Sequence, residues 1–212
     1  MYWIQKSAFV YWFLRVLFLL SVSACATQKP MPSGFLGDYS SLKPSSRTKG
    51  AYVYFHPDRE IKNYTLFIVD PVMIHLRPEA DNRIVHQEEI NALAKYFQHE
   101  IITALEGQYT VVEAPGNGVL VIKTAITDVA PDLLYITPSP ETITSAQGLG
   151  GASMEAALID SLSGEIVAAV MDSRIDPQNK LSVTHTRWGN TKEVLSQWAQ
   201  LLRLRMDEFH RK

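Results

Sequence analysis

The sequence has 212 residues, with 20 Lys and Arg against 22 Asp and Glu, and a formal net charge of −2. This balance argues against the broad basic surface that nucleic-acid binding requires. The length fits one domain with a real core. A single cysteine excludes an intramolecular disulfide, so side-chain packing has to hold the fold together.

The first 24 residues are typical of a secretory signal peptide. They carry two positive charges, Lys6 and Arg15, and no acidic residue, and an apolar run follows Arg15. That uninterrupted run is much shorter than the ~20 residues that cross a bilayer as a helix. A single membrane-spanning anchor remains the alternative, because the residues before Arg15 are also largely apolar.

The signal peptide ends in Val22-Ser23-Ala24-Cys25, which resembles the bacterial lipobox. The resemblance implies cleavage between Ala24 and Cys25 and acylation of Cys25, palmitate included. Several acyl chains give a stable anchor, whereas one chain binds membranes only marginally. Ala26 stands where Asp would direct retention in the inner membrane, so we expect the outer membrane, on its periplasmic face. The alternative is that Cys25 is an ordinary buried cysteine.

Residues 25–47 are rich in Pro, Ser and Gly and are predicted to form a lipidated flexible tether. Residues 35–42 within it contain apolar and aromatic side chains that are unusual in a linker. We expect this stretch to dock on the following domain, and a partner-binding motif is the alternative. Residues 48–212 are then one α/β periplasmic domain.

Strand patterns occur at 64–69 and 72–76, where Pro71 predicts an edge strand or a bulge. Strands at 109–113 and 119–126, separated by a Pro-Gly-Asn-Gly turn, predict a hairpin. Residues 152–160 and 166–171 predict a second hairpin.

Two segments have the 3-4 spacing of apolar residues that indicates an amphipathic helix, at 87–105 and at 190–210. Asn190 with Glu193 three residues later indicates a capped start for the second helix. The predicted fold is α+β (an α/β sandwich): a mostly antiparallel sheet of about five strands with both helices packed on one face. The alanines at 156, 157, 168 and 169 would let helices lie close to this sheet.

The segment from Ala130 to Gly151 is predicted to be a long loop rich in Pro, Thr, Ser and Gly. Loops of this length in compact domains are usually functional or disordered. Leu133, Leu134 and Tyr135 make it the preferred partner-binding surface.

The residues Asp160, Gly164, Glu165 and Asp172 form a candidate turn at the second predicted hairpin. Asp160 and Asp172, with Asp176 nearby, could lie close across paired strands and share a cation. More often an Asp in such a turn binds backbone amides. No two of the six histidines are spaced as metal ligands on a helix. We therefore expect no metal, no cofactor and no catalytic residue.

Several motifs together resemble a family of bacterial lipoproteins known as domain of unknown function three-three-one-three. They are the lipobox, residues 33–39, Asp70-Pro71-Val72, residues 148–151, and residues 160–165 with Asp172 behind them. The resemblance implies no activity. The order of elements also resembles, more distantly, the curli-secretion channel protein, the outer-membrane activators of peptidoglycan synthases and the N-terminal domain of TolB. Those proteins bind partners or build assemblies, which favours a binding role.

The function expected from the sequence is therefore a lipid-anchored outer-membrane lipoprotein. It would act as a non-enzymatic binding or scaffolding module for an envelope protein or peptidoglycan, and it could form homo-oligomers. The alternative is an envelope hydrolase or metal-dependent enzyme that uses Asp160, Asp172 and Asp176.

Overall fold

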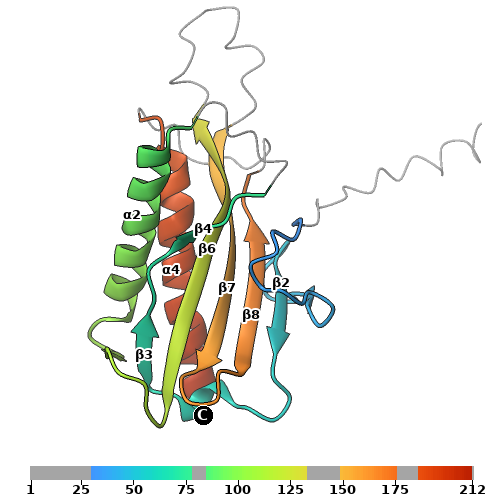
Figure 1. The fold of residues 1–212 in the computed structure, drawn as a ribbon, viewed down its shortest axis with the longest axis vertical. Helices are drawn as coiled ribbons and strands as arrows, with labels where there is room; N and C mark the ends of the chain where they lie inside the picture. The colour runs from blue at the N-terminus through green and yellow to red at the C-terminus, as the bar shows by residue number, and fades with distance from the viewer. Residues whose placement is uncertain (1–29, 78–84, 133–148, 176–185, 212) are drawn as a thin grey trace, which may run out of the picture.

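The computed structural model describes residues 30–77, 85–132, 149–175 and 186–211, which form one twisted sheet with two helices on one face (Figure 1). The strands follow the order β1-β2-β8-β7-β6-β3-β5, and β4 also pairs with β6. The elements are β1 (Lys43–Pro44), β2 (Tyr52–Phe55), the 3-10 turn η1 (Ile61–Asn63), β3 (Leu66–Val69), β4 (Met73–Ile74), α2 (Gln87–Leu105), β5 (Thr110–Val111), β6 (Val119–Asp132), β7 (Leu149–Asp160), β8 (Ile166–Ser173) and α4 (Gly189–His210).

The predicted α+β class and the two helices on one face are confirmed, whereas the predicted sheet is only roughly right. It has eight strands instead of about five. The half formed by β6, β7, β8, β2 and β1 is antiparallel, but β3, β4 and β5 pair in parallel. The two-residue strands are too short to give a periodic signal in the sequence.

The hairpin predicted across residues 109–126 is wrong. Strand β5 pairs in parallel with β3, with Leu66 opposite Thr110, and β6 pairs in parallel with the other side of β3. Helix α2 connects β3 to β5, and a helical crossover is what parallel strands need. The Pro-Gly-Asn-Gly turn therefore lies between two strands that point the same way.

The prediction of a bulge at Pro71 is confirmed. Val69 is opposite Ile122 and Met73 is opposite Ala125, so four steps along β3 and β4 match three steps along β6. The extra residue sits around Pro71, which has no N–H to offer the ladder. The edge-strand alternative fails for β3, which has neighbours on both sides, but it holds for β4, whose one partner among the described residues is β6.

Helix α2 begins and ends at the predicted residues, and its apolar stripe is buried against α4 and the sheet. A reciprocal capping box joins His86 and Glu89 at its start. Phe97 of α2 and Trp198 of α4 pack with ring centroids 6.1 Å apart in the middle of the core. Burying a large apolar side chain of this kind contributes about 1.5–3 kcal/mol.

Helix α4 starts at Gly189, one residue before the predicted start, and Asn190 is buried within its first turn. Asn190 is therefore not the N-cap that the sequence predicts. No helix in the described residues is long and apolar enough to span a membrane.

Strands β6 and β7 extend into the segment predicted to be a long loop. Asp132 pairs with Leu149, and Gly151 pairs with Ala130, so the ladder takes in both ends of residues 130–151. A bulge lies between Ile126 and Asp128. The partner-binding residues predicted in this loop, Leu133, Leu134 and Tyr135, lie outside the described residues, as do Ala24, Cys25 and Asp176.

Candidate functional site

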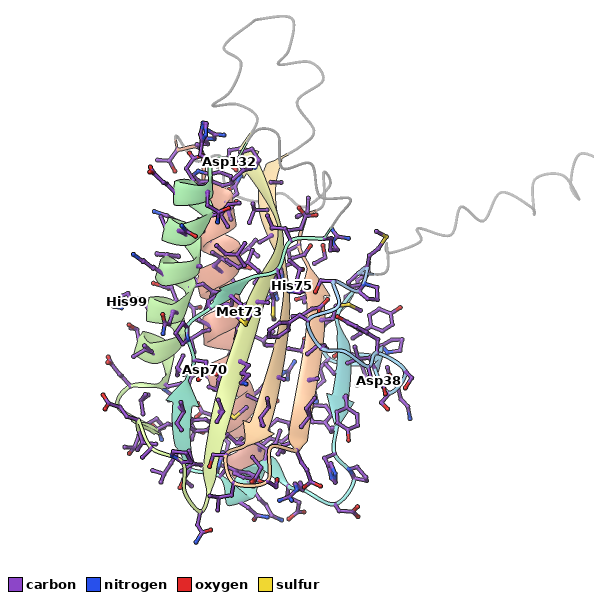
Figure 2. All side chains as sticks on the ribbon, viewed as in Figure 1. Asp38, Asp70, Met73, His75, His99 and Asp132 are labelled. Atoms are coloured by element: carbon purple, nitrogen blue, oxygen red, sulfur yellow. The ribbon has the colours of Figure 1, made fainter. Side chains whose placement is uncertain are left out.

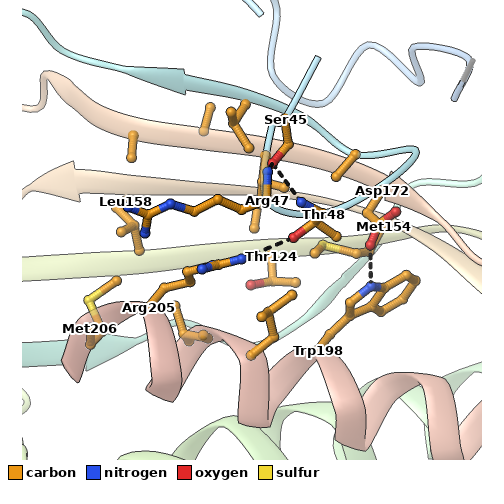
Figure 3. A pocket seen from close by; sticks show the side chains of 18 of the residues that line it. Ser45, Arg47, Thr48, Thr124, Met154, Leu158, Asp172, Trp198, Arg205 and Met206 are labelled. Atoms are coloured by element: carbon orange, nitrogen blue, oxygen red, sulfur yellow. Dashed lines mark hydrogen bonds between the residues drawn. The ribbon is translucent and has the colours of Figure 1, made fainter. Parts of the chain in front are cut away.

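An apolar groove of about 370 Å³ lies between α4 and the outer half of the sheet (Figure 3). Strands β6, β7, β8 and β2 form its floor, α4 forms one wall, and the segment 44–48 closes the outer side. Its size falls within the range of ligand pockets, about 300–1,000 Å³, and such pockets are mostly apolar. The apolar side chains that line it include Val53, Phe55, Ile122, Met154, Ala156, Leu158, Ala168, Val170, Leu201, Leu202, Met206 and Phe209.

The centre of the floor consists of alternate residues of the antiparallel strands β7 and β8. Ala156 of β7 is opposite Val170 of β8, and Leu158 is opposite Ala168. Side chains alternate between the faces of a strand, so these four point to the helix side of the sheet. The two small alanines in the floor leave space that larger side chains would fill. The alanines predicted to bring helices close to the sheet therefore line a hollow at positions 156 and 168.

The wall of the groove is an apolar flank of α4, and Phe97 and Ile101 of α2 line the groove beside it. Leu202, Met206 and Phe209 lie on this flank at helical spacing. Phe209 closes one end by an edge-to-face contact with Phe55 of β2, with centroids 5.6 Å apart. Phe55 is 51% exposed, so this end of the groove reaches the surface.

Two arginines and one carboxylate form what we call the cationic rim: Arg47, Arg205 and Glu208. Arg47 Nη1 lies 2.6 Å, and Arg205 Nη1 lies 2.7 Å, from the same Glu208 Oε2. Arg205 also donates a 3.3 Å hydrogen bond to Thr48 Oγ1, so the rim ties the segment 44–48 to α4. Arg205 is the main cause that lowers the pKa of Glu208. The rim carries one net positive charge.

At the other end of the groove, Asp172 is buried and bonded. Its Oδ2 accepts hydrogen bonds from Trp198 Nε1 at 2.7 Å and Arg174 Nε at 3.3 Å, and its Oδ1 accepts one from the Ser173 amide at 2.9 Å. Only 2% of Asp172 is exposed. A carboxylate held in this way fixes the position of α4 on β8, and its charge is balanced by Arg174.

The opposite face of the same strands is filled by the N-terminal segment. Glu155 of β7 is completely buried, and its two carboxylate oxygens accept hydrogen bonds from the Ser33 amide at 2.7 Å and from Tyr39 Oη at 2.6 Å. Tyr39 Oη in turn accepts hydrogen bonds from the amides of Gly34 and Leu36. Burial and the Glu155 contact raise the pKa of Tyr39.

These bonds confirm that residues 35–42 dock on the domain. Phe35 lies against the ring of His75, with centroids 6.2 Å apart, and β1 at Lys43–Pro44 pairs with β2. Figure 2 shows Asp38 at the outer edge of the N-terminal segment and His75 directly after β4. The chain then passes around the sheet edge and reaches the groove at residues 44–48.

The candidate turn after β7 is a closed structural unit. Asp160 Oδ1 accepts hydrogen bonds from the amides of Leu162 and Ser163, at 3.0 and 2.8 Å, and Oδ2 accepts one from Tyr64 Oη at 2.9 Å. The Ser163 amide is the main cause that lowers the pKa of Asp160 to about 2. Gly164 adopts φ +74° in this turn, which favours glycine. Glu165 forms an ion pair with Arg59.

Asp160 and Asp172 do not come together, so the prediction that they lie close across paired strands is wrong. Asp172 is opposite Met154, six residues before Asp160 on β7, which separates the two carboxylates by about 20 Å. Each is already bonded to its own neighbours. In the part of the chain that the structure describes, no three His, Cys, Asp or Glu side chains are grouped so that they could hold a metal ion.

The groove is the feature that sequence reasoning missed. Its rim joins residues 47 and 205, which are far apart in the chain, and its floor depends on the register between β7 and β8. The only local signal is the pair of Ala-Ala dipeptides at 156–157 and 168–169, which are unusually small for buried strands.

Residues 31–202 match the model of a family described as "Protein of unknown function (DUF3313)". The chain belongs to this family. The match begins just before Ser33 and so takes in the docked segment, the sheet, α2 and the first part of α4, and it ends before the groove residues Arg205, Met206 and Phe209. It confirms the family that the sequence motifs indicate.

No curated protein matches this member of DUF3313. Among solved structures it is similar to the PelC dodecamer from Paraburkholderia phytofirmans, at 12% identity and a TM-score of 0.41, covering 72% of this chain and 96% of that one. It is also similar to protein XCC0632 from Xanthomonas campestris, of the family DUF330, at 12% identity and a TM-score of 0.42, covering 73% and 91%. A DUF4136 family protein from Bacteroides thetaiotaomicron matches at 10% identity and a TM-score of 0.37, covering 76% and 96%. These likenesses carry no information on function.

Proposed function

We propose that this DUF3313 protein is a lipid-anchored binding module of the bacterial envelope that holds a hydrophobic ligand in the groove. The observation that carries the proposal is the groove itself, a mainly apolar hollow of about 370 Å³ between α4 and the sheet. Protein interiors rarely leave such space, because close packing stabilises them. A hollow with an apolar lining is suited to binding a ligand without transforming it.

A soluble chain that starts at Ala26 is suited to testing this proposal, because the bonds that hold the described fold lie within residues 30–211. The probe is N-phenyl-1-naphthylamine, an uncharged dye that fluoresces in apolar surroundings. We expect saturable binding of one dye per chain. Absence of saturable binding would overturn the groove as a ligand site.

A matched pair of variants places the dye in the groove. Ala156→Phe puts a ring into the floor and should abolish dye binding. Leu204→Phe adds a ring on α4 at a position that is 55% exposed and does not line the groove, and it should bind the dye as the unchanged protein does. Equal loss in both variants, or in neither, would contradict binding in the groove.

The anchor rests on the lipobox at Cys25, and it is tested in the full chain by changing Cys25→Ala. We expect the variant to leave the membrane fraction, whereas the unchanged protein stays in the outer membrane on the periplasmic side. Persistence of the unacylated variant in the membrane would favour the spanning anchor instead. A tether to the membrane raises the effective concentration of the domain near ligands and partners in that layer.

We also propose that the domain scaffolds an envelope protein or peptidoglycan through the segment 130–151. The long strands β6 and β7 support both ends of this segment, and its apolar residues Leu133, Leu134 and Tyr135 are the sequence feature behind the proposal. Photo-crosslinking in cells from position 135, compared with the exposed position 162, tests it. Products specific to position 135 are expected, and identical products from both would count against it. A homo-oligomer would appear among them as a crosslink between two copies.

A further inference from the structure

We infer that the ligand of the groove is a single fatty-acid chain whose carboxylate binds at the cationic rim. This inference rests on the proposed function, since it names the chemical class that the same groove takes. It uses two features that the proposed function does not need: the charge of the rim and the small number of polar side chains on the floor of the groove.

The rim already holds one carboxylate in the manner that a fatty acid would require. Two guanidinium groups, from the segment 44–48 and from α4, converge on a single oxygen of Glu208. Each guanidinium has five N–H donors in a fork that matches a carboxylate. One carboxylate cannot neutralise two such groups, so the rim favours a second anion. Arg47 is paired with Glu208 through Nη1 and its side chain is 60% exposed, so its other N–H donors can reach a second anion.

The interior of the groove favours an acyl chain over a peptide. Between the rim and Asp172 the floor is apolar apart from Thr124, and Asp172 is bonded to Trp198. The backbone of an extended peptide would bury most of its N–H and C=O groups against this floor without partners, which is costly. An α-helix with its side chains is about 10 Å wide, so this volume would hold only about one turn. An acyl chain has no polar group to satisfy.

The size of the groove favours one chain over two. A volume of about 370 Å³ is near the lower end of ligand pockets, about 300–1,000 Å³. The floor is narrow because Ala156 and Ala168 are flanked by Met154, Leu158 and Val170. A diacyl phospholipid would have to leave one of its chains in water. We therefore choose the free fatty acid over a membrane phospholipid.

The experiment measures displacement of N-phenyl-1-naphthylamine from the Ala26–Lys212 chain by three competitors below their micelle concentrations. Dodecanoate, dodecanol and dodecylamine share one chain and differ only in the charge of the head group. We expect dodecanoate to displace the dye at a concentration about tenfold lower than dodecylamine, with dodecanol between them. Equal potency of all three would overturn the inference while dye binding, and with it the proposed function, remained.

Variants of the cationic rim test which residues bind the charged head group of the ligand. In the double variant Arg47→Gln with Arg205→Gln, the ratio of the displacing concentrations of dodecanoate and dodecanol should approach one, and this ratio is independent of any change in the affinity for the dye itself. Arg211→Gln, an exposed arginine at the end of α4 that does not line the groove, is the matched control and should keep the preference for dodecanoate. Retention of the preference in the double variant would contradict a head-group site at the rim.

Glu208→Gln provides a gain that a purely structural role would not produce. It removes the carboxylate that competes with the ligand for both arginines, so dodecanoate should bind several-fold more tightly and dodecanol should be unchanged. A weaker affinity for dodecanoate would overturn the inference. The last comparison uses dioleoylphosphatidylglycerol vesicles. If the vesicles displace the dye, the rim variants abolish this displacement and dodecanoate displaces none, the ligand is a phospholipid. This result would overturn the choice of a fatty acid.

Discussion

The two faces of strand β7 meet opposite surroundings. On the helix side, Met154, Ala156 and Leu158 border a hollow, and on the other side Glu155 is completely buried under residues 33–39. The face that carries the buried carboxylate is covered by the N-terminal segment, whereas the apolar face borders the groove. This reverses the usual expectation that apolar side chains are the ones most fully covered. The comparison teaches that the N-terminal segment completes the fold, whereas the groove keeps space for something else.

Removal of the buried carboxylate should have the largest effect on stability. Glu155→Ala deletes the acceptor of two charge-assisted hydrogen bonds, each worth about 1.5–3 kcal/mol, and releases residues 33–39. We expect the free energy of unfolding in urea to fall by about 3 kcal/mol. The exposed Glu113→Ala is the control and should change it by less than about 0.5 kcal/mol. A loss below about 1 kcal/mol would mean that the segment does not stabilise the domain.

Asp160, at the end of β7, provides a second test, in which the effect of a substitution on stability is compared at two pH values. The pKa of Asp160 is lowered from 3.8 to about 2 in the folded protein, so its contribution is present above about pH 4 and is lost as the pH falls toward 2. Asp160→Asn should therefore cost about 1–2 kcal/mol at pH 7 and little at pH 2. Urea unfolding at both values measures this, with the exposed Asp58→Asn as control. A cost independent of pH would refute the role of the charge.

The phenol of Tyr39 contributes a smaller part of the filled face. Tyr39→Phe removes the donor to Glu155 and the acceptor of the Gly34 and Leu36 amides, and should cost about 1 kcal/mol. In a protein that already carries Glu155→Gln, the change Tyr39→Phe should lower the free energy of unfolding by less than about 1 kcal/mol, because the two side chains are bonded to each other. Tyr54→Phe on β2 is the control. Strict additivity would mean that the two side chains act independently.

The hollow face should respond least in stability. Ala156→Phe places a ring into existing space, and aromatic residues suit strands better than alanine. We expect the free energy of unfolding to change by less than about 0.5 kcal/mol, although dye binding is lost. A loss above about 2 kcal/mol would show that this part of the floor is already packed.

Much of the fold could be predicted because its signals are local. Helix α2 has a 19-residue amphipathic pattern with glutamates at its start and a glycine after its end, and its bounds were predicted correctly. The same holds for the β7–β8 hairpin and for the bulge at Pro71. In the docked segment, aromatic side chains within a Pro-rich stretch were enough to indicate contact with the domain, but not to identify Glu155 as its partner.

The errors arise where distant segments compete for the same strand edge. The turn before β6 fits a hairpin, but β3 lies between β5 and β6 because α2 makes a parallel crossover. Asp160 and Asp172 are close in sequence to one hairpin, but the register places them at opposite ends of it. Neither the position of β3 nor the separation of Asp160 and Asp172 can be predicted from ten neighbouring residues, since strand pairing depends on which strand edges in the whole sheet are still unpaired.

By itself the sequence determined the two helices, the strand-rich class and the family. These depend on composition and periodicity, which short-range chemistry sets. Only the tertiary structure decided that alanines 156 and 168 line a hollow, that Arg47 and Arg205 meet at its rim, and that Glu155 is locked by Ser33 and Tyr39. Each of these features joins residues that lie far apart in the chain, so it exists only once the sheet has fixed its register.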